Sequence, residues 1–261
     1  MKPYGKITTI DMWTDPYISK QMLKYHLNFE SDIASRKLDT IKESCKFLLN
    51  TFTRGSTICD FGCGPGLYGN YLQQMGYQVI GVDISENSLE YARKQNSNVI
   101  YLNMNYVSET LPQKIDNAMM IYCDFGALSP NDRKQFLNNL KKVLNPNGFF
   151  IFDVFSDKRF DSLEESSVRY EDKDGFFLPG NAVVESRLIK FTDRKISLSY
   201  DKAVGIRTIE LYNWDQHYNY KEMQTYMNKQ GFRIVDYYSD TVGNKDFTKN
   251  DILMFLCQKM D

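Results

Sequence analysis

The sequence predicts a doubly wound α/β fold, in which helices cover both faces of a mainly parallel sheet. Between about residues 55 and 155, short apolar runs with strand character alternate with segments of helical periodicity. Their connections are short, and strand–helix–strand units of this kind form right-handed crossovers between parallel strands. A glycine turn directly follows the first of these strands, which is typical of ligand sites in such sheets.

The elements of this central region follow from their hydrophobic patterns. We expect strands at 56–61, 77–82, 98–102, 115–122 and 148–154, and helices at 66–75, 86–96 and 131–144. The segment Asn145-Pro146-Asn147-Gly148 predicts a turn between the last helix and its strand, because proline cannot continue the helix.

The flanking regions have other patterns. Residues 14–52 predict two helices, with Ser19 and Asp32 as their N-caps. Alternating β-branched and aromatic residues predict an antiparallel segment, which a helix and two strands follow. We expect a single domain with four parts: an N-terminal helical region at 1–53, a core at 54–156, an antiparallel insertion at 157–214 and a closing part at 215–261. In the closing part we expect a helix at 219–230 and strands at 232–238 and 251–258.

The composition excludes several classes of protein. The 32 basic and 33 acidic residues nearly cancel, so no strong field favours nucleic acid or an anionic membrane surface. The N-terminus has no apolar signal core, and no apolar run reaches membrane-spanning length. The five cysteines include no Cys-x-x-Cys pair, which indicates a reducing compartment and no metal site. We therefore expect a cytoplasmic protein without nucleic-acid or membrane partners.

The glycine turn at 62–66 indicates the chemistry of the ligand. Glycines allow a sharp turn and a close approach of the ligand to the backbone. A dinucleotide-binding turn would have its third glycine at position 67, where this chain has Leu67. Asp60 precedes the turn, and its carboxylate suits an ammonium group better than a pyrophosphate. Asp83 ends the next strand, where acidic residues bind ribose hydroxyls. These features favour a cofactor that carries an amino acid and a ribose.

These motifs resemble those of the class I S-adenosylmethionine-dependent methyltransferases. The segments that carry the resemblance are Ile58–Gly66, Val79–Ser85, Leu111-Pro112 with Ile115–Met120, and Leu140–Gly148. The resemblance covers about residues 50–155 strongly and the closing elements weakly. It implies a Rossmann-like sheet of seven mainly parallel strands, an N-terminal helical lid over the cofactor, and an antiparallel insertion that lines the acceptor pocket.

The resemblance also implies roles for individual residues. Asp60 and the glycine turn would receive the methionine part of the cofactor, Asp83 the ribose, and Ile84 the adenine. For the adenine amino group the candidates are Asn103 and Asn105, and Asn105 with Met104 matches the family's usual pair better. The cofactor-binding residues implied in this way are Asp60, Gly62, Cys63, Gly64, Gly66, Asp83, Ile84, Met104, Asn105, Tyr122, Cys123 and Arg36, of which Arg36 would pair with the cofactor carboxylate.

The acceptor side is less determined by the sequence. Methyl transfer from a sulfonium is an in-line displacement that needs alignment in a dry pocket, and a general base only where the nucleophile arrives protonated. His26, Tyr17 and Arg36 are candidates from the helical lid, and a surface or capping role is the alternative for each. The remaining candidates for the catalytic site are Asp124, which also suits a cap of the following turn, and His217, near Trp214 and Tyr218.

We therefore predict an S-adenosylmethionine-dependent methyltransferase that acts on a small molecule. One alternative is an NAD(P)-type dinucleotide oxidoreductase, and another is a module that binds S-adenosylmethionine without catalysis. The sequence leaves open the acceptor atom, the use of a general base and the oligomeric state.

Overall fold

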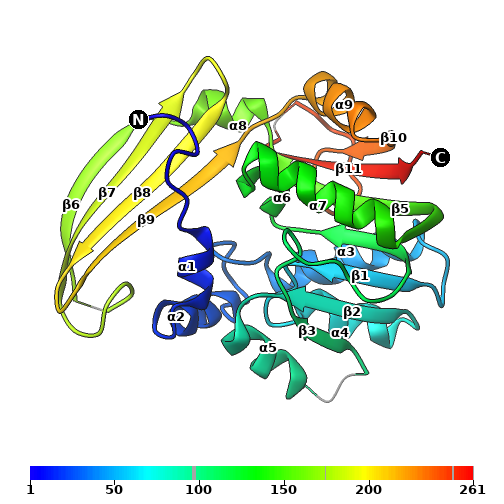
Figure 1. Ribbon diagram of the computed structural model, residues 1–261, viewed down its shortest axis with the longest axis horizontal. Coiled ribbons are helices and arrows are strands. Elements are labelled where there is room, and N and C mark those ends of the chain that lie inside the picture. Colours follow the sequence, from blue (N-terminus) through cyan, green and yellow to red (C-terminus); the bar gives the residue numbers. More distant parts are fainter. Residues whose placement is uncertain (96–97, 174, 249, 261) are drawn as a thin grey trace.

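The computed structural model consists of two sheets and nine helices among the residues that it describes, 1–95, 98–173, 175–248 and 250–260. The larger sheet has seven strands in the order β10-β11-β5-β4-β1-β2-β3, and the smaller has four in the order β6-β7-β8-β9 (Figure 1). Neighbouring strands from β5 to β3 are parallel, whereas β11 is antiparallel to both β5 and β10. This is the doubly wound, mainly parallel sheet that the sequence predicts.

The strands of the larger sheet and the helices that cover it have the following bounds. The strands are β1 Thr57–Phe61, β2 Gln78–Asp83, β3 Ile100–Asn103, β4 Ile115–Met120, β5 Leu144–Phe155, β10 Phe232–Tyr238 and β11 Ile252–Lys259. The helices are α3 Leu38–Leu49, α4 Leu67–Gln74, α5 Glu86–Arg93, α6 Asp124–Ala127, α7 Pro130–Val143 and α9 Tyr220–Lys229.

Alternation along the strands divides the core between the two faces of this sheet. In β1, Cys59 and Phe61 belong to a buried cluster with α7 and α9. Ile58 belongs instead to a cluster with α3, α4 and α5 on the opposite face. Successive strand side chains point to opposite faces, so a nearly continuous apolar strand fills both layers. The helices therefore hold the carboxyl ends of β1, β2 and β4 at one edge of the sheet.

The smaller sheet lies beside that edge, together with the N-terminal helices (Figure 1). Its strands are β6 Ser166–Asp172, β7 Ala182–Phe191, β8 Ile196–Val204 and β9 Thr208–Gln216, all antiparallel. The N-terminal helices are α1 Thr9–Thr14 and α2 Ile18–His26, and the short α8 Asp157–Ser162 leads into the insertion. Both α1 and α6 pack against β9, which brings the insertion to the core of the domain.

Several local predictions are wrong. Ser19 lies inside α2 and its hydroxyl donates to the Asp15 carbonyl, while the Asp15 carboxylate accepts from the amides at the start of that helix. Asp32 accepts from the Lys37 amide, but α3 begins only at residue 38. The predicted turn at 145–148 is a bulge within β5, between its pairings Leu144–Ile115 and Phe149–Asn117. Side-chain hydrogen bonds of Asp15 and Asp32 thus replace the predicted caps before α2 and α3.

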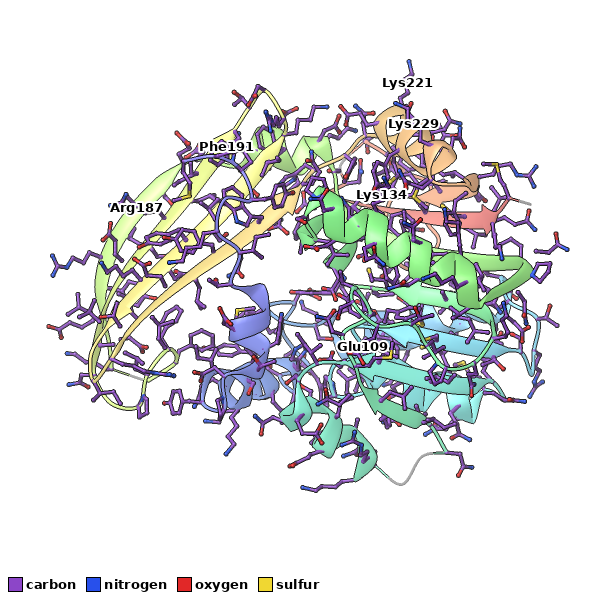
Figure 2. The ribbon with its side chains drawn as sticks, in the orientation of Figure 1. Glu109, Lys134, Arg187, Phe191, Lys221 and Lys229 are labelled. Carbon is purple, nitrogen blue, oxygen red and sulfur yellow. The ribbon has the colours of Figure 1, made fainter. Side chains whose placement is uncertain are left out.

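The surface charges are spread over the outside of the molecule. Lys134 of α7 and Lys221 and Lys229 of α9 are exposed and point into solvent (Figure 2). Among the described residues, no helix combines the length and the apolar character needed to cross a membrane.

Candidate functional site

A cavity of about 620 Å³ opens at the carboxyl ends of β1, β2 and β4. Its walls come from α1, α2, the glycine turn after β1, the loops after β2, β3 and β4, and the end of β9. Five aspartates line it, namely Asp60, Asp83, Asp124, Asp132 and Asp215. Its volume lies within the range of roughly 300–1,000 Å³ that is usual for small-molecule sites.

The backbone of the glycine turn lies directly against two other parts of the cavity wall, the loop after β4 and helix α2. Gly62 has φ +78°, and a Cβ atom there would lie 2.3 Å from Oδ2 of Asp124. Gly64 has φ +51°, and a Cβ atom there would lie 3.6 Å from Cε1 of His26. Both positions favour glycine, because L-residues rarely adopt positive φ. The turn therefore packs closely against the loop after β4 on one side and against α2 on the other.

The amides of the turn are already engaged within the protein. Gly62 and Cys63 donate to the Val82 carbonyl, and Gly64 donates to Oδ2 of Asp83 at 2.8 Å. A phosphate would need these N–H groups as donors. The turn therefore suits a cationic group better than a pyrophosphate, which agrees with the prediction that the Asp60 carboxylate binds an ammonium group.

Asp60 is a deeply buried carboxylate of the cavity wall. The residue is 3% exposed, and its Oδ2 has no hydrogen-bond partner among the described residues. Burial, together with the charge of Asp83, raises the pKa of Asp60 to about 7. A buried acceptor without a donor is unfavourable, so this oxygen fits a ligand that donates a proton, such as an ammonium group.

Asp83 is held at the end of β2 by its own neighbours. Its carboxylate accepts from the amides of Gly64 at 2.8 Å and Ser85 at 2.7 Å. Burial raises the pKa of Asp83, and these hydrogen bonds oppose the shift. An ionised carboxylate has about four acceptor positions, so two remain for the hydroxyls of a ribose.

The loop after β3 forms the next part of the wall, with differences from the prediction. Asn105 lines the cavity, and its Oδ1 accepts from the Val107 amide. Met104 lies in the buried core and does not line the cavity, and Asn103 donates to Glu86 outside it. The side chains that accompany Ile84 at this wall are instead Tyr106, Val107 and Ser108.

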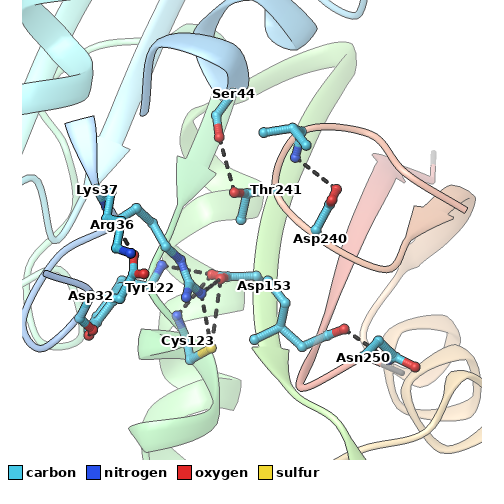
Figure 3. Close-up of polar contacts among 12 residues, drawn as sticks. Asp32, Arg36, Lys37, Ser44, Tyr122, Cys123, Asp153, Asp240, Thr241 and Asn250 are labelled. Carbon is cyan, nitrogen blue, oxygen red and sulfur yellow. Dashed lines mark hydrogen bonds and ion pairs between the residues drawn. The ribbon is translucent and has the colours of Figure 1, made fainter. Parts of the chain in front are cut away.

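The loop after β4 has a strained backbone that a buried carboxylate holds (Figure 3). Tyr122 and Cys123 have φ of +86° and +66°, which costs about 1–3 kcal/mol for each such residue. Oδ1 of Asp153 accepts from both of their amides, at 2.7 and 2.8 Å. Asp153 therefore positions this loop, which carries Tyr122 and Asp124 into the cavity wall.

Arg36 takes part in this clamp rather than lining the cavity. Its Nη2 lies 2.8 Å from Oδ2 of Asp153, and its guanidinium lies over the Tyr122 ring, 4.9 Å from the centroid. Its Nε is buried without a partner among the described residues. The structure thus gives Arg36 a protein carboxylate as partner, where the sequence predicts the carboxylate of a cofactor.

The structure brings together most, but not all, of the predicted cofactor residues. Those that line the cavity are Asp60, Gly62, Cys63, Gly64, Asp83, Ile84, Asn105 and Tyr122. Those outside its lining are Gly66, Met104, Cys123 and Arg36.

The candidates for catalysis separate into two groups. Asp124 and His26 line the cavity, whereas Tyr17 and His217 do not. The Tyr17 hydroxyl donates to the Gly175 carbonyl. His217 is 1% exposed, with Nε2 2.9 Å from the Ser197 hydroxyl and Nδ1 3.2 Å from the Ser156 carbonyl. Both ring nitrogens have protein partners, so His217 joins the insertion to the end of β5.

Asn213 and Asp215 line the cavity from β9 and were not predicted from the sequence. Successive residues of a strand face opposite sides. Trp214 therefore points away from them, and its indole N–H donates to the Lys6 carbonyl. Met12 and Trp13 of α1 also line the cavity. The alternation Asn213-Trp214-Asp215 was the available signal, since it separates the two polar residues from the buried aromatic one.

The residues of the cavity fit S-adenosylmethionine in their chemistry. Asp60 is an acceptor without a donor, Asp83 keeps free acceptor positions, and Ile84 and Tyr106 provide apolar surface. No Lys or Arg is found among the described residues that line the cavity. In the part of the chain that the structure describes, no group of three or more His, Cys, Asp or Glu side chains is arranged to hold a metal ion.

Comparison with known proteins agrees with this assignment. Residues 58–148 match the model of the methyltransferase domain family. A malonyl-[acyl-carrier protein] O-methyltransferase of Pectobacterium atrosepticum is 28% identical over 134 residues, which are 49% of this chain and 51% of that protein. The chain thus aligns with about half the length of this relative.

Solved structures share the fold over more of the chain. An S-adenosylmethionine-dependent methyltransferase of Clostridium acetobutylicum has a TM-score of 0.70 and 16% identity, over 93% of this chain and 99% of its own. The amino pentose methyltransferase CalS10 of Micromonospora echinaspora, bound to S-adenosylmethionine, has a TM-score of 0.58 and 14% identity, over 85% and 91%. The predicted fold is confirmed, and residues 58–148 match the methyltransferase domain family that the sequence predicts.

Proposed function

We propose that this methyltransferase domain transfers the methyl group of S-adenosylmethionine to a small-molecule acceptor. One observation carries the proposal: Asp60, a buried carboxylate with an unpartnered oxygen, lines the same cavity as Asp83 and the glycine turn. An ammonium group and a ribose on one ligand would use both carboxylates. The amino-acid end and the nucleoside of S-adenosylmethionine carry these two groups.

The residues of the chain would hold and orient the cofactor, which supplies a methyl group on a sulfonium. Asp60 binds the ammonium group, and Asp83 binds the ribose hydroxyls. Ile84 and Tyr106, which line the cavity, would pack against the adenine, and Asn105 of the same wall would contact its edge. The protein thereby aligns the methyl group with an acceptor and contributes mainly by orientation.

The N-terminal segment would act as a lid over this site. Met12, Trp13, Met22 and His26 line the cavity from α1 and α2. Their apolar surface excludes water from the region where the methyl group passes to the acceptor. We assign residues 1–53 to this lid, 54–156 to the cofactor-binding core, 157–214 to the insertion and 215–261 to the closing elements.

Two other functions fit the structure less well. A dinucleotide oxidoreductase would need free amides in the turn, and these amides donate to Val82 and Asp83. A module that binds the cofactor without catalysis needs no space for an acceptor. This cavity is lined by the glycine turn and also by Asn213 and Asp215 of β9. Space beyond the cofactor residues favours a bound acceptor.

Calorimetric titration with S-adenosylmethionine and S-adenosylhomocysteine tests the proposal. We expect both to bind, and Asp60→Asn and Asp83→Asn to weaken binding at least about tenfold, because each removes a buried charged acceptor. Asp39→Asn, an exposed carboxylate on α3, is the control and leaves the affinity unchanged. Unchanged affinity in both cavity variants, or tighter binding of NAD than of either adenosyl ligand, contradicts the proposal.

A further inference from the structure

The part of the cavity beyond the cofactor residues is lined by hydrogen-bond acceptors. Asp124 begins α6, directly above Gly62, and Asp215 lies on β9. Between these elements the packing is tight, since a Cβ atom on Gly126 of α6 would lie 3.0 Å from the Gln216 carbonyl of β9. Asn213 lies two residues before Asp215 on the same face of β9, and its buried Oδ1 has no partner among the described residues. Three acceptors from two elements therefore converge on one space.

The acidic residues of the cavity have no basic residue to pair with among its described lining. Its five carboxyl groups are those of aspartates, and its one histidine, His26, is neutral because burial lowers its pKa to about 4. S-adenosylmethionine brings two positive charges and one negative charge. Its ammonium group would engage Asp60, its sulfonium is the second positive charge, and no basic side chain lines the cavity beside Asp124 and Asp215 among the described residues. Asp132 differs from these two, because it accepts from Ser129 at the start of α7.

Unpaired carboxylates in such a place are unfavourable in their charged form. Burial, with the charges of Asp83, Asp153, Asp60 and Asp215, raises the pKa of Asp124 well above its usual range. Burial raises the pKa of Asp215 to about 6, against the opposing charge of Arg159. An anionic acceptor such as a carboxylate or phosphate would add to this repulsion. A cation between the two carboxylates would relieve it.

We propose that the acceptor is an amine, which enters as an ammonium ion between Asp124 and Asp215. Asp215 and the Asn213 carbonyl oxygen hold the ammonium group, and Asp124 removes a proton from it. Asp124 takes this role because its carboxylate lies against Gly62, at the boundary with the cofactor residues. The inference rests on the proposed methyltransferase function and adds the class of acceptor and the base.

The reaction balances without any further reactant. The ammonium nitrogen gives one proton to the Asp124 carboxylate and so gains a lone pair. That pair forms the new N–C bond with the methyl carbon while the S–C bond breaks, and its electrons stay on sulfur. The products are a methylated ammonium ion and the neutral thioether, and the proton leaves Asp124 for solvent when the site opens. A carboxylate with a raised pKa is suited to accept this proton.

Ligands that differ only in their head group test the inference by binding. The full-length protein is saturated with S-adenosylhomocysteine and titrated with benzylamine, benzyl alcohol and phenylacetate, and then with butylamine, butanol and pentanoate. We expect the amine of each set to bind most tightly and the carboxylate most weakly. A series in which no amine binds more tightly than its alcohol, or in which a carboxylate binds as tightly as the amine, overturns the inference.

Variants then test the two carboxylates. Asp124→Asn and Asp215→Asn keep the shape of the side chains, and we expect each to weaken amine binding at least about tenfold while the alcohols are unaffected. Glu210→Gln removes a carboxylate of β9 that does not line the cavity, and it leaves amine binding unchanged. Equal amine affinity in the wild type and in both cavity variants overturns the assignment of these residues.

Two measurements, the affinity for S-adenosylhomocysteine and the kinetic constants of the variants, separate this inference from the function on which it rests. If S-adenosylhomocysteine itself fails to bind, the proposed function fails first; if it binds and the amines show no preference, only the acceptor class fails. With an amine that is methylated, Asp124→Asn lowers kcat more than it raises KM, and Asp215→Asn does the reverse. Retained S-adenosylhomocysteine affinity shows that each variant is folded.

Discussion

The two ends of the cavity are built in different ways. The cofactor end comes from segments that directly follow neighbouring strands, and its groups are tied to one another: the Gly64 amide donates to Asp83, and the amides of Gly62 and Cys63 donate to the Val82 carbonyl. The acceptor end comes from α1, α6 and β9, which are far apart in the sequence. Its buried Asn213 Oδ1 has no partner among the described residues, as is also true of Asp60 Oδ2 at the cofactor end.

This difference indicates how each end meets its ligand. Hydrogen bonds within the cofactor end hold it in one shape before any ligand arrives, so that binding requires little reorganisation. The shape of the acceptor end depends instead on how α6 packs against β9, two elements of the described chain that no backbone hydrogen bond of the larger sheet joins. Gly62 lies at the boundary, because its backbone belongs to the first end and touches Asp124 of the second.

Gly62→Ala is the change that we expect to damage both ends most. The new Cβ would lie 2.3 Å from Oδ2 of Asp124, so the Asp124 carboxylate must move, and we expect S-adenosylhomocysteine affinity to fall about a hundredfold. Gly180→Ala is the matched control, because Gly180 also has φ +78° but has nothing within 4 Å of its Cβ position. Calorimetry compares the two, and an equal loss in both would show that backbone conformation, not the contact with Asp124, is responsible.

Asp153→Asn would show whether the clamp behind the loop supports both ends. The change removes the charge of the fully buried Asp153 and leaves Arg36, whose side chain is 17% exposed, without its ion-pair partner; the loss of one partner of a buried pair destabilises a protein by about 3–5 kcal/mol. Urea unfolding measures the free energy of unfolding. Glu43→Gln, which breaks the exposed pair with Lys46, should change it by less than about 0.5 kcal/mol. Similar small changes in both variants would contradict a structural role for the buried pair.

A change of pH should act on the cofactor end through Asp60. Its pKa is raised to about 7 in the free protein, with Asp83 as the neighbouring charge that contributes after burial. An ammonium ligand needs the ionised form, so below pH 7 binding requires that a proton be released. S-adenosylhomocysteine affinity should therefore fall about tenfold per pH unit below 7. Asp60→Asn should remove this dependence in calorimetry, and a profile unchanged by the variant would assign the proton to another group.

The same shift has the opposite sign for stability. The folded protein binds the Asp60 proton at a higher pH than the unfolded chain does, so this group favours folding more at low pH. Its contribution decreases as the pH rises from about 4 and stays low above 7. The difference in unfolding free energy between the wild type and Asp60→Asn, measured across this range by urea denaturation, should follow that direction.

His217→Asn should have the smallest effect on the cavity. The ring lies between Phe155 and Phe160 and does not line the cavity. Its nitrogens form hydrogen bonds with the Ser197 hydroxyl and the Ser156 carbonyl. We expect a loss of stability of about 1–3 kcal/mol, because buried partners lose their bonds, with unchanged affinity for S-adenosylhomocysteine and for amines. A selective loss of amine binding at unchanged stability would return His217 to the acceptor site.

The reach of sequence analysis differs between the two ends for a physical reason. Asp60, the glycine turn and Asp83 were predictable because each follows directly from a strand end in a parallel sheet, where position along the chain determines position in space. The pairing of Arg36 with Asp153 was not predictable, because Asp153 is 117 residues away and nothing local indicates that their side chains meet. Met104 was placed on the cavity, whereas the loop after β3 directs Tyr106 there instead.

The sequence by itself determined the doubly wound core and the chemistry of its cofactor end, because periodicity sets strands and helices, and a glycine turn with flanking carboxylates is a local pattern. Only the tertiary structure decided that Asp124 and Asp215 line one space and that His217 lies outside it. These outcomes depend on the packing of α6 against β9 and on which face of β9 is turned inward. Such contacts join residues that no local pattern connects.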